Sequence, residues 1–599
     1  MKHYYCTTLS KDYLYKGLLL YKSLEKVDDN FHFYFVCLHE ETKELLSKMH
    51  LKNATIIPIS DIEAEDSQLL QVKESRNDKE YIWTSKASAM LYILRNFKGT
   101  DHIVWLDGDT YFFSDPAPIY KEWGNYSIML TKERWRKRDK IRENQIGIYN
   151  TGFMGFRRDR HGLKALNWFR NKLIMWCYDK NKFKIGPWSD QVYVNDWPDR
   201  FQNVGVIKNI GVNLNPYIVQ GCKISKDKDH LYVNDTKLIF YHYYGFKYYD
   251  GNEFDLCGYA PNLKDNVLKL IYLPYINAVN DITKFIKSVD SNFFKLKNPK
   301  EYYISRYFNL TQNQRAKANH PNLCAIVTKD FVVRVVTMYN SLKTYTKSFH
   351  LWILCVDDIS YKALEKMNLD HVTLITLKNI GTKKLKKLEK TRKLNEFCWT
   401  LKAPFIRFLI RNNFNIDSII YLDSDIFFFK DIKSIYEDWG SKSILITKHS
   451  EPKVEKKYGE FQAGLIGFKR NKTGLRCLRW WQKKCFKWCY DNFDDKRQWA
   501  DQKYLEQWPR KFQNVRIAQN KGINAGEWNV RSLTIEVKDR SVYIDGDELI
   551  AYHFSGVPAN DEKRELLKRR ETSKKVKKYI YKIYIEELKK TAKKLGVNN

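Results

Sequence analysis

The chain of 599 residues contains the same pattern twice, and this duplication constrains its fold more than any other feature. The segment IVWLDGDTYFFSD (103–115) matches IIYLDSDIFFFKD (419–431) at 7 of 13 positions. Further pairs, such as WPDRFQNV (197–204) with WPRKFQNV (508–515), occur in the same order. A repeated unit of about 290 residues is far too long for a solenoid. The sequence therefore predicts two similar globular domains, at 1–310 and 323–599, joined by a polar linker at 311–322.

Each copy alternates short apolar runs with helical patterns. The runs at 31–38 and 102–106 in the first copy, and at 350–356 and 418–422 in the second, are typical of buried strands. The alternation predicts an α/β fold, with a mostly parallel central sheet flanked by helices in each domain. Ligands of such sheets bind beyond the carboxyl ends of the strands, so polar residues that follow the strands are the first candidates for a site.

Composition and charge restrict the class of protein. The 43% hydrophobic and 29% charged residues are ordinary for a globular protein and exclude a low-complexity chain. Eleven cysteines are too few for a disulfide framework, and their odd number favours a reducing compartment. No signal-peptide core and no run of roughly 18 apolar residues is present. We therefore expect a cytoplasmic protein.

The net charge of +34 suits three kinds of partner: nucleic acid, an anionic membrane surface or a negatively charged substrate. No nucleic-acid module is recognisable, so we expect no specific nucleic-acid partner. The segment 574–595 reads as a basic amphipathic helix, which would allow peripheral contact with an anionic membrane surface. A solvated, lysine-rich surface is the alternative explanation of the charge.

An Asp-x-Asp motif follows an apolar strand in both copies, as Asp107 with Asp109 and as Asp423 with Asp425. Hard divalent cations such as Mg²⁺ and Mn²⁺ prefer oxygen ligands and often share them with substrate phosphates. An Asp-rich turn is the alternative. Recurrence of the motif at the same place in both copies favours a metal site.

At these motifs the sequence resembles nucleotide-sugar glycosyltransferases of the GT-A fold. It is most similar to the glycogenin and lipopolysaccharide galactosyltransferase group and to single-domain bacterial relatives, and the resemblance covers both copies almost end to end. The resemblance implies that each Asp-x-Asp binds Mn²⁺ or Mg²⁺ bridging the donor diphosphate. It also implies that His242 and His553, each in an H-x-x-G segment, complete the metal sites. A polar core histidine is the alternative reading.

The resemblance assigns further positions in matching pairs. They comprise a helix lysine facing the sugar-phosphate, a strand-turn touching the donor sugar and an Asp-Gln pair at the reacting face of the sugar. In this sequence they are Lys86, Asn150, Gly152, Asp190 and Gln191 in the first copy, and Lys402, Gln462, Gly464, Asp501 and Gln502 in the second. The exchange of Asn150 for Gln462 departs from the group's pattern.

The resemblance places the nucleotide base after the first strand of each copy. An acidic and an aromatic residue there could hydrogen-bond and stack a uracil, although helix capping would also explain such residues. The candidates are Thr7, Thr8, Asp12 and Tyr13, and in the second copy Thr328 and Asp330. Lys247 lies near the group's diphosphate-binding lysine, whereas the second copy has Val557 and the residues after it there.

Together these features predict a metal-dependent glycosyltransferase with two candidate active sites. By resemblance the donor is a UDP-sugar, the transfer retains anomeric configuration, and the acceptor is a glycan or other hydroxyl-bearing molecule. One active domain with a degenerate twin is the nearest alternative, because of Gln462 and the missing lysine. A noncatalytic glycan- or nucleic-acid-binding protein is another. A metal-dependent phosphohydrolase would need more acidic or histidine ligands.

Overall fold

The computed structural model consists of two compact units, which meet in the chain between Phe308 and Asn309. Helix α11 (Leu310–Arg315) occupies the first part of the expected linker. The predicted boundaries at 310 and 323 stay a prediction. The structure describes residues 2–135, 137–143, 145–179, 187, 189–257, 263–293, 307–315, 320–380, 382–494, 498–530, 533–539, 541–557 and 573–596.

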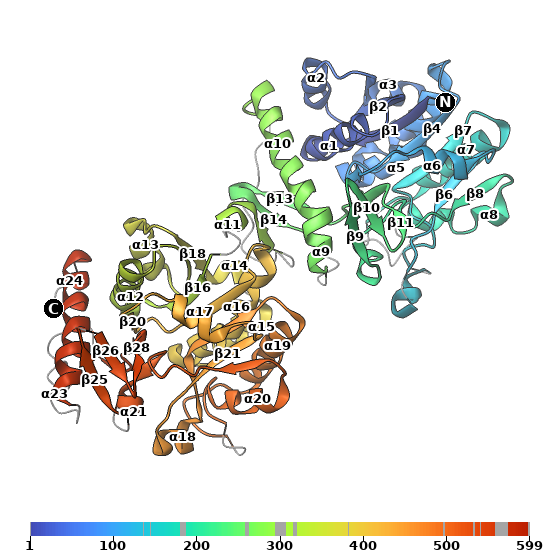
Figure 1. Ribbon diagram of the computed structural model, residues 1–599. Coiled ribbons are helices and arrows are strands. Elements are labelled where there is room, and N and C mark those ends of the chain that lie inside the picture. Colours follow the sequence, from blue (N-terminus) through green and yellow to red (C-terminus); the bar gives the residue numbers. More distant parts are fainter. Residues whose placement is uncertain are drawn as a thin grey trace. The chain divides into compact units, whose positions relative to one another are not determined.

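Each unit contains a seven-stranded sheet, and the two sheets have the same strand order (Figure 1). The first runs β3 (Ala54–Pro58), β2 (Phe31–Cys37), β1 (His3–Leu9), β4 (His102–Leu106), β7 (Phe153–Arg157), β6 (Ile128–Thr131) and β8 (Val204–Ile207). The second runs β18 (Val372–Thr376), β17 (His350–Cys355), β16 (Asn322–Val327), β19 (Ser418–Leu422), β22 (Phe461–Lys469), β21 (Ile444–Lys448) and β23 (Val515–Ile517). Strands β7 and β22 are antiparallel to both neighbours, and the other pairings are parallel. The predicted mostly parallel α/β sheet is therefore confirmed in both units.

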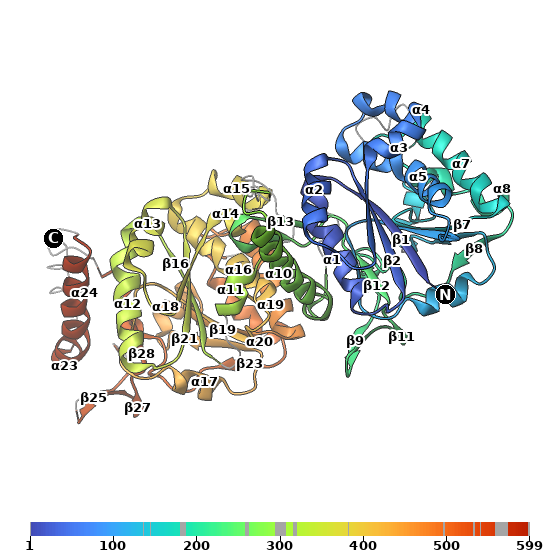
Figure 2. The same ribbon diagram turned by 90° about the horizontal axis from the view of Figure 1, so that it is seen from above.

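Helices cover both faces of each sheet, so the central strands are buried along most of their length. In β16, Cys324 and Ile326 pack in the core under α16 (Leu394–Asn412) and α19 (Lys472–Lys487). The alternate residues Leu323 and Ala325 pack toward α12 (Val332–Tyr345). Figure 2 shows the strands of this unit between α12 and α16. Period-two alternation between two buried faces explains why β16 reads as a continuous apolar run.

A short ribbon in each unit brings the histidine of the H-x-x-G segment to the Asp-x-Asp motif. Strand β12 (Phe240–His242) pairs antiparallel with β5 (Thr110–Phe112), and His242 lies opposite Thr110. Strand β28 (Ala551–His553) pairs with β20 (Ile426–Phe428) in the same register, with His553 opposite Ile426. Because β5 and β20 begin directly after the motif, this register places each histidine beside the second aspartate.

A C-terminal helix supports the histidine strand in both units. Tyr275 of α10 (Leu273–Val289) stacks on Tyr243 with ring centroids 3.7 Å apart. Tyr584 of α24 (Lys582–Lys594) stacks on Phe554 at 3.8 Å. Each stacking partner directly follows the site histidine, so the helix fixes the strand that holds it.

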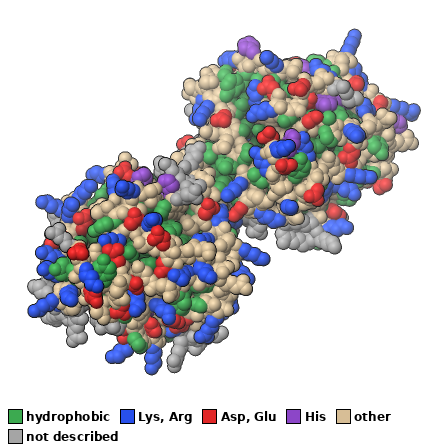
Figure 3. Space-filling view, in the orientation of Figure 1, with side chains coloured by type: hydrophobic (Ala, Val, Ile, Leu, Met, Phe, Trp, Pro, Cys, Tyr) green, Lys and Arg blue, Asp and Glu red, His purple; other side chains and the backbone are tan. Residues whose placement is uncertain are grey.

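The apolar face of the basic helix near the C-terminus packs against its own unit. Tyr584, Leu588 and Ala592 are buried, and α24 packs on α12 (Figure 1). Only its lysine-rich face therefore remains for an anionic surface. On the face shown in Figure 3, Lys and Arg spread over both units and are interspersed with Asp and Glu. No helix in the described part of the chain is long and apolar enough to cross a membrane.

We expect Leu588→Ala to lower the free energy of unfolding by about 2–5 kcal/mol, because it leaves a cavity where Leu588 is fully buried against the domain. Urea unfolding followed by circular dichroism measures this loss. The control Lys590→Ala, at a side chain 80% exposed on the same helix, should change stability by less than about 0.5 kcal/mol. Equal effects of the two substitutions would show that α24 is not part of the domain core.

Candidate active site

Two carboxylates and an imidazole converge at the carboxyl end of β4 in the first unit. Nε2 of His242 lies 3.1 Å from Oδ1 of Asp109 and 3.8 Å from Oδ2 of Asp107. One ligand atom from each residue falls within 4.8 Å of the others. Adjacent ligands of an octahedral ion with bonds of about 2.1 Å lie about 3 Å apart, so the three groups could hold one metal ion.

The second unit repeats this arrangement. Nε2 of His553 lies 3.0 Å from Oδ1 of Asp425 and 3.9 Å from Oδ2 of Asp423. Burial alone would lower the pKa of His553, but Asp425 and Asp423 outweigh burial and raise it. The other ring nitrogen, Nδ1, is buried and makes no hydrogen bond.

A glycine beside each cluster leaves room for the histidine. A Cβ at Gly152 would lie 2.4 Å from Cε1 of His242 and 2.8 Å from Oδ2 of Asp107. A Cβ at Gly464 would lie 2.5 Å from Cε1 of His553. Any side chain at these positions would displace the imidazole, which explains why the Gly of the strand-turn occurs in both copies.

A buried lysine ties the Asp-x-Asp motif to the Asp-Gln pair. Lys86, 1% exposed on α5 (Asp78–Asn96), lies 2.5 Å from Oδ2 of Asp190 and 3.6 Å from Oδ1 of Asp107. It also donates a hydrogen bond to the carbonyl of Thr151 at 2.9 Å. Burial opposes its charge, yet Asp107 and Asp190 raise the pKa of Lys86. The lysine is therefore a protonated bridge between two carboxylates 83 positions apart in the sequence.

Lys402 of α16 makes the equivalent contacts, 3.0 Å to Oδ1 of Asp423, 3.3 Å to Oδ2 of Asp501 and 3.1 Å to the carbonyl of Ala463. Against the opposing effect of burial, the two carboxylates raise its pKa. Burial raises the pKa of Asp501 to about 6, and Lys402 only partly offsets it.

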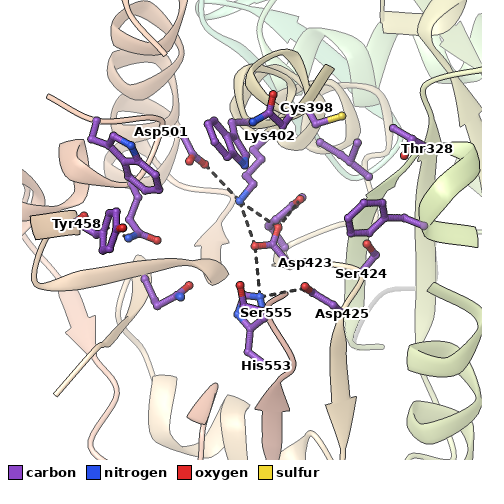
Figure 4. A pocket seen from close by; sticks show the side chains of 18 of the residues that line it. Thr328, Cys398, Lys402, Asp423, Ser424, Asp425, Tyr458, Asp501, His553 and Ser555 are labelled. Atoms are coloured by element: carbon purple, nitrogen blue, oxygen red, sulfur yellow. Dashed lines mark hydrogen bonds and ion pairs between the residues drawn. The ribbon is translucent and has the colours of Figure 1, made fainter. Parts of the chain in front are cut away.

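These groups line a cavity of about 850 Å³ in the second unit. In Figure 4, Lys402 projects between Asp423 and Asp501, and His553 lies below with Asp425. Thr328 lies on one side of this centre, and Tyr458 and Asp501 lie on the other. The predicted residues Asp330, Gln462 and Gln502 also line the cavity. The structure thus gathers predicted base, metal and sugar positions of the second copy in one space.

One buried residue near the Asp-Asp-His cluster differs between the units, and the sequence analysis did not identify it. Glu133, buried at the end of β6, accepts hydrogen bonds from Asn150 at 2.6 Å, Tyr244 at 3.0 Å and Asn215 at 3.2 Å. Burial raises its pKa, and these donors partly offset the effect. Asn150 is further hydrogen-bonded to Gln191 at 3.4 Å. A carboxyl group therefore organises the predicted sugar-facing residues of the first unit.

The second unit has His449 in the place of Glu133, two residues past the shared Ile-x-x-Thr of the strand. Its Nδ1 donates to the carbonyl of Gly459 at 2.6 Å, and burial lowers its pKa to about 4. The ring is therefore neutral near pH 7, and Nε2 accepts from the amide of Gln502 at 3.5 Å. The first unit therefore has a carboxyl group, Glu133, where the second unit has a neutral imidazole, His449.

A basic residue near the second aspartate was also missed. Lys16 lies 3.7 Å from Oδ2 of Asp109 and donates to the carbonyl of Phe246 at 3.1 Å. Arg334, at the corresponding place in the second copy, donates to the carbonyl of Val557 at 2.9 Å. The paired segments KDYLYKG and KDFVVRV contained this signal, because a basic residue recurs five positions after the shared Lys-Asp begins.

The remaining predicted residues of the first copy differ in their exposure to solvent. Thr7 and Thr8 are buried near the end of β1, with hydroxyl groups that make no hydrogen bond. Tyr13 is 42% exposed, and the ammonium of Lys16 lies 4.3 Å from its ring centre. Lys247 is exposed at the start of β13 (Lys247–Tyr249). Its predicted contact with a diphosphate stays a prediction, and the segment after Val557 in the second copy lies outside the described residues.

Each unit is an α/β domain with an Asp-x-Asp motif directly after its central strand. The family model described as glycosyl transferase family 8 matches residues 6–184 and 322–466, together more than half of the chain. The chain therefore belongs to glycosyl transferase family 8.

Two bacterial relatives each match about one half of this chain. Bacillus subtilis (strain 168) YfnD, described as an uncharacterized protein, is 30% identical over 290 residues, which cover 48% of this chain and 92% of YfnD. YfnF of the same organism is 30% identical over 278 residues, 44% of this chain and 90% of YfnF. Among solved structures, the galactosyltransferase LgtC in complex with donor and acceptor sugar analogs covers 45% of this chain and 95% of its own at 13% identity (TM-score 0.31). The WbbM bifunctional glycosyltransferase covers 100% and 99% at 10% identity (TM-score 0.31).

The raised pKa of Asp501 predicts that the free energy of unfolding depends on pH. A carboxyl group with a folded-state pKa of about 6, above its usual value near 4, destabilises the folded state as pH rises between these values, and the full cost remains above pH 6. We expect Asp501→Asn, which cannot ionise, to gain stability relative to the unsubstituted protein between pH 4 and pH 7. Chemical unfolding at both pH values measures this. A stability difference independent of pH would contradict the assignment.

Proposed function

We propose that the chain transfers sugars from nucleotide-sugar donors, by resemblance UDP-sugars, to hydroxyl-bearing acceptors, and that each unit contains an active site. The observation that supports this most strongly is the repeated cluster of Asp-x-Asp, histidine, buried lysine and Asp-Gln pair. All four parts recur in both units, with histidine-to-aspartate distances of 3.1 and 3.0 Å and lysine-to-aspartate distances of 2.5 and 3.3 Å. The buried lysine pairs alone could be retained for stability, because breaking a buried ion pair is destabilising. The proposal of two active sites therefore rests on the whole set, including the Asp-x-Asp motif and the histidine.

The metal site would consist of Asp107, Asp109 and His242 in the first unit. Its equivalents in the second unit are Asp423, Asp425 and His553. Two carboxylates and one imidazole suit Mn²⁺ or Mg²⁺ and leave coordination positions for diphosphate oxygens. A bound divalent cation supplies charge neutralisation for the departing nucleoside diphosphate.

The chain's own residues have distinct tasks in this proposal. Lys86 and Lys402 hold Asp190 and Asp501 in place and add positive charge on the phosphate side of the donor. Asp190 and Asp501 face the anomeric carbon, where a carboxylate stabilises positive charge developing on the sugar. Gln191 and Gln502 position the sugar hydroxyl groups. Retention of configuration is part of the proposal through the resemblance alone.

We expect sugar transfer to require a divalent cation, because the carboxylate pairs would face the diphosphate without charge compensation. After metal stripping with excess EDTA, product formation from UDP-sugars should fall to background, and Mn²⁺ or Mg²⁺ should restore it. Circular dichroism before and after stripping controls for unfolding. Full activity in EDTA would overturn the metal assignment.

We expect Asp109→Ala to abolish one transfer and spare a second, and Asp425→Ala to do the reverse. The reason is that the residues hydrogen-bonded around the two sites differ, Glu133 against His449, and specificity resides in such contacts. Mass spectrometry of products from a panel of UDP-sugars and acceptors measures this. The two variants are matched, so each serves as the control for the other.

If one substitution removes all products and the other removes none, the unit with the silent substitution is a degenerate twin. Each variant must retain the thermal unfolding midpoint of the parent to within a few degrees, so that loss of a product reports on the site.

We also propose that the basic face of α24 contacts an anionic membrane surface. Co-sedimentation of the protein with anionic vesicles measures this binding.

A further inference from the structure

Among the aromatic side chains that line the cavity of the second unit, three form one group of ring contacts. They are Trp399, Tyr458 and Trp499, called here the aromatic wall, and all three are partly exposed. The ring centroids of Trp399 and Trp499 lie 5.7 Å apart at 49°, and those of Tyr458 and Trp499 lie 4.8 Å apart at 57°. The rings are tilted against one another and line one cavity, rather than forming a closed stack.

Each member of the aromatic wall is connected to a residue at the sugar end of the cavity. Trp399 precedes Lys402 by three residues on α16, so the two side chains share a helix face. Tyr458 ends α18 (Pro452–Tyr458), and its carbonyl accepts a hydrogen bond from the amide of Gln502 at 3.2 Å. Trp499 lies two residues before Asp501. The wall is therefore held beside the groups proposed to surround the anomeric carbon.

The order of groups along the cavity indicates what the wall contacts. Thr328 lies on the far side of the metal cluster from Asp501 and Tyr458 (Figure 4). A donor extended from the base position at Thr328 across Asp423 would place its sugar at Asp501. The next molecule in line, the acceptor, would then meet the aromatic wall.

We infer that the aromatic wall is an acceptor subsite that binds the apolar face of a pyranose ring, so that the second unit glycosylates a carbohydrate. This rests on the proposed function. A pyranose presents C–H groups on its faces and hydroxyl groups at its edge. Partly exposed aromatic rings bury the C–H face, while nearby polar groups bind the hydroxyl groups.

The corresponding positions of the first copy differ in part. The ammonium of Lys79 lies 4.6 Å from the ring centre of Trp83 and forms an ion pair with Asp179 at 3.0 Å. Trp83 corresponds to Trp399, and Asn395 replaces Lys79 in the second copy. Ile146 stands where the second copy has Tyr458. Trp188, two residues before Asp190, corresponds to Trp499 and lies outside the described residues. The two copies therefore share both tryptophans in sequence and differ at the positions of Tyr458 and Asn395.

The test uses the full chain with Asp109→Ala, so that only the second site transfers. Methyl α- and β-pyranosides of glucose, galactose and N-acetylglucosamine are the acceptor probes, and glycerol and a serine-containing peptide are the non-sugar probes. We expect transfer to at least one pyranoside and a rise of roughly tenfold in its KM with Trp499→Leu. Trp499→Phe should restore most of the affinity. Donor KM and donor hydrolysis without acceptor should change less than twofold.

Trp480→Leu is the matched control, because Trp480 lies on α19 in the same unit, against Lys484 and Lys511 and away from the cavity lining. An equal rise in acceptor KM with Trp480→Leu would overturn the inference, as would a rise in donor KM with Trp499→Leu. Transfer to the peptide or glycerol but to no pyranoside would also overturn it and leave the proposed function intact. Absence of both donor hydrolysis and transfer to every probe in the parent would instead refute the proposed function.

Discussion

The site of each unit depends on the ion pairs of one buried lysine, Lys86 in the first unit and Lys402 in the second. Lys86 joins the Asp-x-Asp motif after β4, the strand-turn carbonyl at Thr151 and the carboxylate of Asp190. A buried charge is expensive unless it is paired and hydrogen-bonded. The three elements must therefore stay together for the lysine to be stable. The same contacts at Lys402 show that the duplication preserved this constraint.

The surroundings of this charged centre diverged. Glu133 draws Asn150, Asn215 and Tyr244 into one hydrogen-bonded group. In the second unit the neutral ring of His449 binds Gly459 and Gln502 instead. The exchange of Glu133 for His449 after the strand thus accompanies a different set of hydrogen-bond partners. Retained charges with different surroundings support the proposal that the two units share a chemistry and differ in specificity.

The C-terminal helices connect the site to the outer layer of each unit. The stacks of Tyr243 with Tyr275 and of Phe554 with Tyr584 hold the strands that end in the site histidines. Each of these strands pairs over only three residues with β5 or β20, beside the main sheet. Such short pairing is weak on its own, so the aromatic stacking adds rigidity. The basic sequence at the C-terminus is accordingly part of the domain core on one face and solvated on the other.

The sequence by itself determined the duplication, the α/β fold and the strand-end aspartates, because these depend on local periodicity and on residues a few positions apart. It also identified, by resemblance, residues that the structure gathers, such as Lys86 with Asp190. It did not reveal the role of Glu133, the neutral state of His449 or the contact of Lys16 with Asp109. Tertiary structure alone decided these, because they depend on burial and on contacts between segments far apart in the chain. The aromatic wall is of the same kind, since Trp399 and Trp499 meet only when the fold brings a helix and a distant loop to one cavity.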